Sequence, residues 1–400
     1  MIELLLGVLI GVFSGLIPGI HTNTLAALII AYSTALLSIF NPSQLPVVIF
    51  TAAITHTFVD ILPSVFTGVP DEDTAIAVLP AHDMVLDGRG VEAVSISALA
   101  SLGSFLISIP IFLAFLSVLE HIDDYISAAV PYFLLMTSAF IILNESDPFE
   151  TAVSLKKKCY ASGVFVTSGL VGVVALNHAH LAQLSSASSV FLPLLTGLFA
   201  SPALIISIAH KTEIPPQERG SKMPSPTSIF AGCFSGSLVS IFPGVTSGIA
   251  TAMSAAGMKS TEEYLSALSA ANTSNAFLCF AVFLAIGNIR SGAVDAISRF
   301  PSLDYHILVI MGVVVALMAT QLTILCALGI TRVLPKINFT AFSIVILTFL
   351  IFFVVMLTGW FGLLIFAIAT PVGLSTLFLK VRRINCMGCL IFPVLLIYML

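Results

Sequence analysis

Long apolar runs, separated by short polar stretches, follow one another along the whole chain. The runs lie at residues 2–40, 44–66, 94–118, 127–144, 158–176, 188–208, 226–258, 264–286, 304–330, 339–378 and 387–400. A bilayer-spanning α-helix needs about 20 consecutive apolar residues, and most of the runs reach that length. Transmembrane β-strands would instead alternate in segments of about 10 residues. The pattern predicts an all-α polytopic membrane protein with about 10–12 transmembrane segments.

Two of these runs are interrupted by a Pro-Gly pair, at Pro18-Gly19 and at Pro243-Gly244. Proline lacks a backbone N–H and breaks a helix, and each backbone group that this frees in lipid costs several kcal/mol unless protein or water satisfies it. We therefore predict broken or re-entrant helices at both pairs. The run 339–378 is long enough for two spans, and we predict its turn near Thr358, Gly359 and Trp360.

The two halves of the chain share a layout. The first broken run reads GVFSGLIPGIHTNTLAAL, and the second reads GCFSGSLVSIFPGVTSGIATAM. The proline-rich, charged segment KTEIPPQERGSKMPS separates the halves. We predict a first transmembrane repeat at 1–210, a connector at 211–225 and a second repeat at 226–400. Interrupted hydrophobic segments at matching places in two halves are the best sequence pointer to a transporter binding site.

Basic residues indicate how the repeats are oriented. They cluster at Lys156–Lys158, in the connector, at Arg332 and Lys336, and at 380–383. Loops rich in Lys and Arg stay in the cytoplasm. We assume that both broken runs are hairpins and count the spans between these basic clusters. The count predicts that the first hairpin opens to the outside of the cell and the second opens to the cytoplasm. The sequence thus predicts two inverted repeats.

Composition supports a multi-pass protein of the cell membrane. Of the 400 residues, 58% are hydrophobic and 9% charged, against about 25% charged in an ordinary globular domain. The net charge of −5 is diffuse and indicates no nucleic-acid partner. The six cysteines are scattered, and we interpret them as packing residues. The first residues lack a basic segment and a cleavage site, so we expect a retained helix rather than a signal peptide.

The two breaks supply candidate substrate-binding residues. A broken helix exposes N–H groups and a positive dipole end, which favour an anion. Arginine adds bidentate pairing with carboxylate or phosphate. The predicted substrate-binding residues are Pro18, Gly19, His21, Thr22, Asn23, Thr24, Pro243, Gly244, Thr246, Ser247, Arg89 and Arg290. The alternative is a pair of structural kinks repaired by neighbouring helices, with Arg89 as a cytoplasmic anchor.

A second polar layer suggests cation coupling. Asp60 lies deep in an apolar run, and an intramembrane carboxylate is a functional hypothesis by default. It can bind Na⁺ or carry a proton. The predicted cation-coupling residues are Thr55, His56, Asp60, Asn272, Thr273, Ser274 and Asn275. The alternative is that Asp60 lies near a membrane interface or pairs structurally with His56 one helical turn away.

No Walker loop, G-x-S-x-G or HExxH motif occurs in the sequence. We therefore predict no enzyme and no cofactor other than a bound Na⁺. The features together predict a secondary-active permease that moves an organic anion of the carboxylate class with Na⁺ or H⁺ by alternating access.

The chain resembles the TctA family, the large membrane subunit of tripartite tricarboxylate transporters, in an archaeal-type variant. The resemblance rests on G-x-x-x-G-x-I-P-G at Gly11–Gly19, on LPAHDMVLDGRGVEA at 79–93, and on the second Pro-Gly pair with Ala-Asn-Thr-Ser at 271–274. It implies a cation-coupled importer of carboxylates that works with a small membrane subunit and an extracytoplasmic binding protein. It also implies that Pro18, Gly19, Pro243 and Gly244 shape the site.

Two other interpretations stay open. The segment FPGVTSG at 242–248 also resembles a motif of polyprenyl-phosphate translocases, in which a half-helix end holds a lipid phosphate. A membrane scaffold without transport activity is the other alternative. The sequence leaves the oligomeric state open, a homo-oligomer included.

Overall fold

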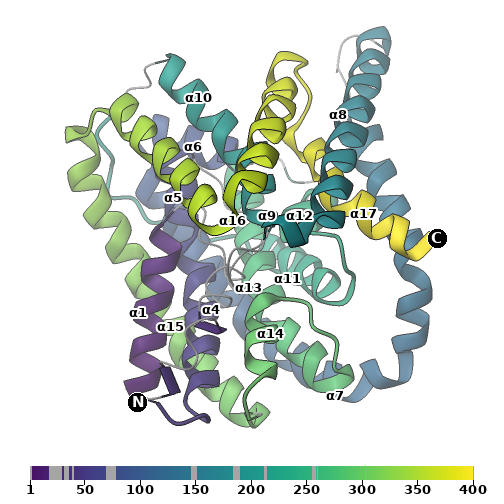
Figure 1. Ribbon diagram of the computed structural model, residues 1–400. Helices are drawn as coiled ribbons and strands as arrows, with labels where there is room; N and C mark the ends of the chain where they lie inside the picture. Colours follow the sequence, from purple (N-terminus) through teal and green to yellow (C-terminus); the bar gives the residue numbers. More distant parts are fainter. Residues whose placement is uncertain are drawn as a thin grey trace.

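The computed structural model describes residues 2–17, 29–30, 36–37, 40–68, 78–145, 151–182, 190–210, 214–254, 258, 260–301 and 303–399. Every regular element among these residues is a helix (Figure 1). The α-helices are α1 (Ile2–Leu16), α4 (Leu45–Val59), α5 (Ile61–Thr67), α6 (Val78–Leu86), α7 (Gly90–Leu143), α8 (Thr151–Asn177), α9 (Phe191–Leu195), α10 (Ser201–His210), α11 (Pro226–Ile241), α12 (Ser247–Ser254), α13 (Thr261–Ile286), α14 (Gly292–Ser298), α15 (Tyr305–Val333), α16 (Phe339–Phe378) and α17 (Gly388–Met399). Short 3-10 or π turns are η1 (Ala179–Ala182), η2 (Thr196–Ala200), η4 (Leu334–Lys336) and η5 (Arg383–Met387). The prediction of an all-α polytopic membrane protein is confirmed.

Within the described residues, seven helical segments are long and apolar enough to span a bilayer. Two of them, α7 with 54 residues and α16 with 40, far exceed the roughly 20 residues of one span. Helix α16 is broken at Gly359, whose φ of 64° and ψ of −158° are not helical. The turn predicted near Thr358, Gly359 and Trp360 is therefore confirmed.

Helix α7 stays helical through residues 119–126, where the sequence predicted a polar linker. That expectation is wrong in detail, because the polar residues lie on an exposed helical surface and leave the backbone pattern intact. The helix nevertheless changes direction. Ser104 Oγ donates to Ala270 O of α13 (2.6 Å), whereas Phe133 stacks on Phe242 with ring centroids 4.3 Å apart. Figure 1 shows α7 curving at the bottom of the view and rising along the right-hand edge.

Glycine residues bring two helix pairs into close contact. Helix α1 packs on α4, and a methyl group added at Gly11 would lie 2.6 Å from the carbonyl oxygen of Ala52. Helix α11 packs on α13 in the same way, with Gly232 directly against the Ala267 carbonyl. Membrane helices associate through such small residues spaced four apart. Both halves of the chain therefore contain a helix of 15 or 16 residues that is held against a later helix by glycine contacts.

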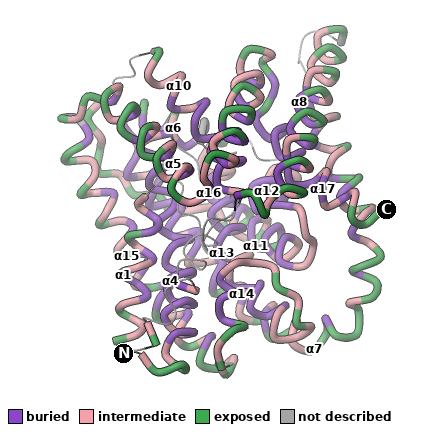
Figure 2. The backbone as a smooth tube through the Cα atoms, in the orientation of Figure 1, coloured by how far each residue is buried: buried purple, intermediate pink, exposed green. Residues whose placement is uncertain are grey.

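The hydrophobic core has two main clusters, and each draws on both halves of the chain. One joins α1, α4–α6 and the first half of α7 to α13–α15. The other joins the second half of α7, α8 and α9 to α11, α12, the second half of α16 and α17. In Figure 2 the central helices α4 and α13 are largely buried, while exposed residues gather on the outer helices. The division into repeats at 1–210 and 226–400 stays a prediction.

The described part of the connector, 214–225, forms no helix and crosses the start of α7. The backbone N–H of Glu218 donates to Gly88 O (2.8 Å), and Gln217 Oε1 accepts from the N–H of Gly90 (2.8 Å). The connector thus holds the corner between α6 and α7, which belong to the first half of the chain.

The helix break predicted at Pro243-Gly244 is present. Helix α11 ends at Ile241, Gly244 has a φ of 79°, and α12 starts at Ser247. Helix α12 folds back along α11, since Ser235 Oγ lies 2.6 Å from Ser254 Oγ. The 16 residues of α11 extend about 24 Å, less than the roughly 30 Å of a bilayer core. The hairpin tip is therefore placed at membrane depth if α11 starts at the membrane surface.

Candidate functional site

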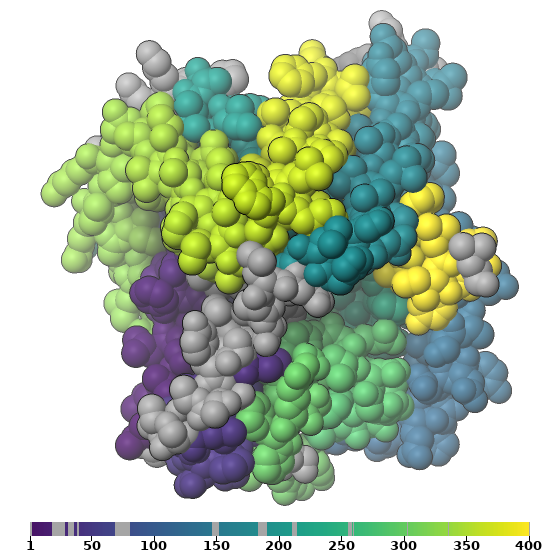
Figure 3. Space-filling model, viewed as in Figure 1, coloured from purple at the N-terminus to yellow at the C-terminus, as the bar shows by residue number. Residues whose placement is uncertain are grey.

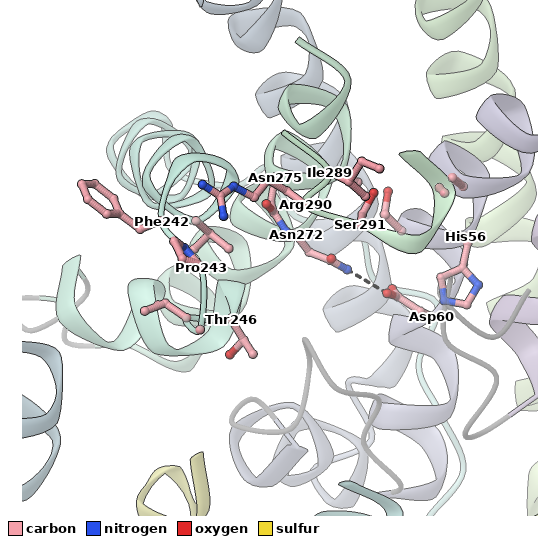
Figure 4. A pocket seen from close by; sticks show the side chains of 17 residues that line it. His56, Asp60, Phe242, Pro243, Thr246, Asn272, Asn275, Ile289, Arg290 and Ser291 are labelled. Atoms are coloured by element: carbon pink, nitrogen blue, oxygen red, sulfur yellow. Dashed lines mark hydrogen bonds between the residues drawn. The ribbon is translucent and has the colours of Figure 1, made fainter. Parts of the chain in front are cut away.

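A polar cavity of about 230 Å³ lies where the Pro243-Gly244 break meets α4, α13 and the residues that lead into α14 (Figure 4). Its walls come from both halves of the chain. The lining residues are Ala53, His56, Thr57, Asp60, Val239, Phe242, Pro243, Gly244, Val245, Thr246, Asn272, Asn275, Ala276, Ile289, Arg290, Ser291 and Ala293.

The end of α4 places Asp60 in the cavity wall. The backbone N–H of Asp60 still bonds to His56 O (2.9 Å), so both side chains project from neighbouring turns of one helix face. Pro63, which has no N–H, follows in α5, so the helical hydrogen-bond pattern is interrupted next to Asp60, whose φ of −59° and ψ of −19° stay helical. The sequence therefore presents a carboxylate at a helix junction inside the membrane domain.

Asp60 and Asn272 connect α4 with α13 across the cavity. Asn272 Nδ2 donates to Asp60 Oδ2 at 2.7 Å, and both residues are buried. Nδ1 of His56 shares a hydrogen bond of 2.9 Å with Ser14 Oγ on α1. A buried carboxylate is costly unless hydrogen bonds or a cation stabilise its charge. This corner can therefore hold a proton or a monovalent cation.

The remaining members of the predicted cation set divide into two groups. Asn275 lines the cavity, and its Oδ1 accepts from Cys279 Sγ at 3.4 Å. Thr55, Thr273 and Ser274 do not line it. Thr55 packs under Gly11 of α1, Thr273 Oγ1 donates to Thr57 Oγ1 (3.2 Å), and Ser274 Oγ donates to Ala270 O (2.7 Å). These three hydroxyls lie in the helix contacts beside the cavity.

Arg290 supplies a cation to the same cavity. Its Nε is buried without a hydrogen-bond partner, and the side chain makes no ion pair with any residue that the structure describes. In Figure 4 Arg290 lies beside Pro243 and Asn275 at one end, Asp60 and His56 lie at the other, and Asn272 lies between them. A partly buried guanidinium whose buried Nε donor is unused favours a bound anion.

Arg89, the other predicted cation, lies outside the cavity. It precedes α7 and forms ion pairs with Glu92 (2.8 Å) and Glu262 (2.6 Å). The pKa of Arg89 is raised, mainly by the hydrogen bond from its guanidinium to Glu92 and secondly by the one to Glu262. The structure thus surrounds Arg89 with carboxylates, whereas Arg290 has no carboxylate partner among the residues described.

Two helix N-termini reach the cavity. Thr246 Oγ1 accepts from the N–H of Ile249 (3.4 Å) at the start of α12, and Ser291 Oγ accepts from the N–H of Val294 (3.3 Å) at the start of α14. Three of the predicted substrate-binding residues, Pro243, Gly244 and Thr246, line the cavity, while Ser247 is fully buried and does not line it. The positive ends of helices add to the cavity's preference for negative charge.

The sequence reasoning did not single out Ser291, Phe242 or Ile289, which also line the cavity. A serine directly before an apolar run is an N-cap signal that could have identified Ser291. Nothing in the sequence pattern distinguishes Phe242 or Ile289 from other apolar residues. The first break falls outside the described residues, and with it the predicted residues Pro18, Gly19, His21, Thr22, Asn23 and Thr24.

Comparison with known proteins assigns the chain to a family. Residues 1–388 match the family model described as Tripartite tricarboxylate transporter TctA family. The chain is also 31% identical over 210 residues to the uncharacterized protein MJ1079 of Methanocaldococcus jannaschii. That match covers 51% of this chain and 48% of the relative, so the chain spans about half the length of the curated relative it matches. No solved structure matches the chain.

Proposed function

The chain belongs to the tripartite tricarboxylate transporter TctA family, and from the geometry of the cavity we propose that it moves an organic carboxylate across the membrane together with Na⁺ or H⁺. The observation that carries the proposal is Arg290, a partly buried cation without a carboxylate partner among the described residues, in a polar cavity at a helix break. The chain is a multi-pass protein of the cell membrane.

The substrate carboxylate binds Arg290 in this proposal. The guanidinium offers several N–H donors in a plane that matches a carboxylate. The N-termini of α12 and α14 and the amide of Asn275 surround the same space and offer further donors. An apolar wall at Phe242 and Ile289 contacts the carbon skeleton.

The coupling cation binds near Asp60. The carboxylate lies at the opposite end of the cavity from Arg290 and holds Asn272 by a hydrogen bond. Na⁺ or a proton at Asp60 neutralises a buried charge and lowers the cost of placing a second carboxylate, that of the substrate, in the same cavity. Cation and anion binding therefore favour each other, as coupled transport requires.

We propose alternating access because the cavity lies between α4 and α13. The two helices come from opposite halves of the chain, and the break at Pro243-Gly244 forms a third wall. Movement of one half against the other would open the cavity to one side of the membrane and then to the other. Membership of a tripartite family further supports a small membrane subunit and an extracytoplasmic binding protein as partners.

A ligand-induced thermal shift of the purified full chain tests the proposal. We expect citrate or succinate to raise the Tm of the wild type in the presence of Na⁺, since a ligand at 100 times its Kd adds about 2.7 kcal/mol of stability. Arg290→Gln abolishes the shift, while Arg290→Lys, which keeps the charge, retains part of it. Arg299→Gln is the matched control, because Arg299 is exposed and pairs with Asp295 outside the cavity.

If citrate or succinate raised the Tm of the wild type and of Arg290→Gln equally, the result would contradict a substrate site at Arg290. A shift caused by a short prenyl phosphate and by neither carboxylate would instead favour the lipid-phosphate translocase suggested by FPGVTSG. Solutions matched in ionic strength separate specific binding from salt effects.

A further inference from the structure

An apolar groove of about 640 Å³ lies between the end of α1, helix α5, the end of α15 and the first part of α16. Among the described residues that line it, Thr67 is the single polar one. Each of its four walls comes from one helix, as represented by Leu16 of α1, Phe66 of α5, Val333 of α15 and Ile346 of α16. In Figure 3 the yellow-green block that contains the end of α15 and the first part of α16 lies directly beside α1 in purple. The groove shares no lining residue with the polar cavity, so it is a separate feature.

The groove opens on surfaces of membrane-spanning helices. Val333 on α15 is 54% exposed and Phe349 on α16 is 39% exposed, although both line the groove. Exposed apolar side chains on spans of this length face the hydrocarbon of a bilayer. Lipid tails are as apolar as these side chains, so an acyl chain fits the chemistry of the groove.

A pair of basic residues lies in the same last turns of α15 and η4 as the groove-lining residues. Arg332 lies three residues after Gly329, and Lys336 lies three residues after Val333, so each is a neighbour, one turn away, of a residue that lines the groove. Arg332 and Lys336 are exposed, and neither makes an ion pair with a residue that the structure describes. Two positive charges that have no ion-pair partner among the described residues therefore lie beside this end of the groove.

The charge pattern identifies the leaflet. Segments rich in Lys and Arg lie on the cytoplasmic side, where anionic lipids give the leaflet a negative surface potential. Basic pockets beside transmembrane helices on that side bind anionic headgroups. We infer that the groove holds one acyl chain of an anionic phospholipid, whose phosphate contacts Arg332 and Lys336.

Native mass spectrometry of the purified, delipidated full chain tests the inference. Dioleoyl phosphatidylglycerol, which is anionic, and dioleoyl phosphatidylcholine, which is zwitterionic, are added back at equal concentration. We expect the wild type to bind phosphatidylglycerol more tightly. Each basic residue near a membrane surface contributes about a fivefold gain in affinity, so Arg332→Gln with Lys336→Gln weakens phosphatidylglycerol binding about 25-fold. Lys157→Gln with Lys158→Gln on α8 is the charge control and leaves it unchanged.

A second variant tests the groove itself. A methyl group added at Gly329 meets open space, so Gly329→Leu fills the groove without a backbone clash. It is expected to abolish binding of both lipids at this site. Gly163→Leu on α8 is the matched control, because Gly163 is also a helical glycine with open space around it. Folding of each variant is checked by its Tm and monodispersity.

Three results would overturn the inference. Phosphatidylglycerol binding that is unchanged in Gly329→Leu would separate the lipid from the groove. Displacement of phosphatidylglycerol by an equal concentration of inorganic phosphate would show a phosphate site without an acyl chain. A second polypeptide could also co-purify with the wild type and be lost in Gly329→Leu while lipid binding stays unchanged. That result would assign the groove to a helix of a partner protein.

Discussion

Asn272 of α13 donates a 2.7 Å hydrogen bond to the carboxylate of Asp60 at the end of α4, and the two residues are 212 positions apart. Each side chain is buried in the wall of the polar cavity. The bond joins the two halves of the chain at the place where the proposed cation binds. In the proposed transport cycle, separation of α4 from α13 would break this bond, and a cation bound at Asp60 would offset the loss by stabilising the carboxylate charge.

Asp60→Asn tests this link. The substitution keeps the size of the side chain and leaves an amide oxygen that can still accept from Asn272, so we expect the free energy of unfolding to change by no more than about 1 kcal/mol. The carboxylate charge is lost. The citrate-induced rise in Tm should therefore no longer depend on Na⁺ or on acid pH.

Asp123→Asn is the control for this prediction. Asp123 accepts from Asn288 at 3.5 Å, so it forms the same kind of Asp–Asn pair, but outside the cavity. It should leave cation dependence intact. Retained Na⁺ or proton dependence in Asp60→Asn would remove Asp60 from the coupling mechanism.

Gly232→Ala should destabilise the contact between α11 and α13. The added methyl group falls against the backbone carbonyl of Ala267, and such overpacking costs about 1–3 kcal/mol. Gly163→Ala meets open space on α8 and should raise stability by up to about 1 kcal/mol through better helix propensity. The Tm of both variants in one detergent measures the difference, and equal Tm values would contradict the close packing.

Gly359→Asn should destabilise the turn inside α16. The φ of 64° and ψ of −158° at Gly359 belong to a region that is open essentially to glycine alone, and another residue there costs about 1–3 kcal/mol. Gly287 ends α13 with a φ of 73° and ψ of 1°, a left-handed conformation that asparagine adopts. A Tm loss in Gly359→Asn that exceeds the loss in Gly287→Asn is therefore expected, and the reverse order would argue against the turn.

Glu145→Ala should loosen the end of α7 from the segment before α17. Glu145 Oε1 accepts from the backbone N–H of Arg382 and from Asn385 Nδ2, both at 2.8 Å, and the residue is buried. Loss of the acceptor leaves the buried Nδ2 of Asn385 without this partner and removes the ion pair of Glu145 with Arg382 (3.3 Å), at a cost of about 1–3 kcal/mol. Glu120→Ala, at an exposed position of α7, should change the Tm little. A Tm in Glu145→Ala equal to that of wild type would show that solvent replaces the acceptor.

Several features of the fold were predictable because they depend on local sequence. The length of the apolar runs predicted spanning helices, and a glycine between two spans predicted the turn at Gly359. The proline and glycine at 243–244 predicted the break between α11 and α12. The helical course of α7 through 119–126 was not predicted, because polar residues form an exposed helix surface as readily as a loop.

The sequence by itself determined the membrane class, the second helix break and the chemical character of Asp60 and Arg290, because run length, proline and buried charge are properties of a single segment. Only the tertiary structure decided which polar residues meet. It placed Asp60, Asn272 and Arg290 in one cavity and surrounded Arg89 with Glu92 and Glu262. The reason is physical: these neighbours depend on which helices pack together, and that is set by close contacts such as Gly11 on α4 and Gly232 on α13, between residues far apart in the chain.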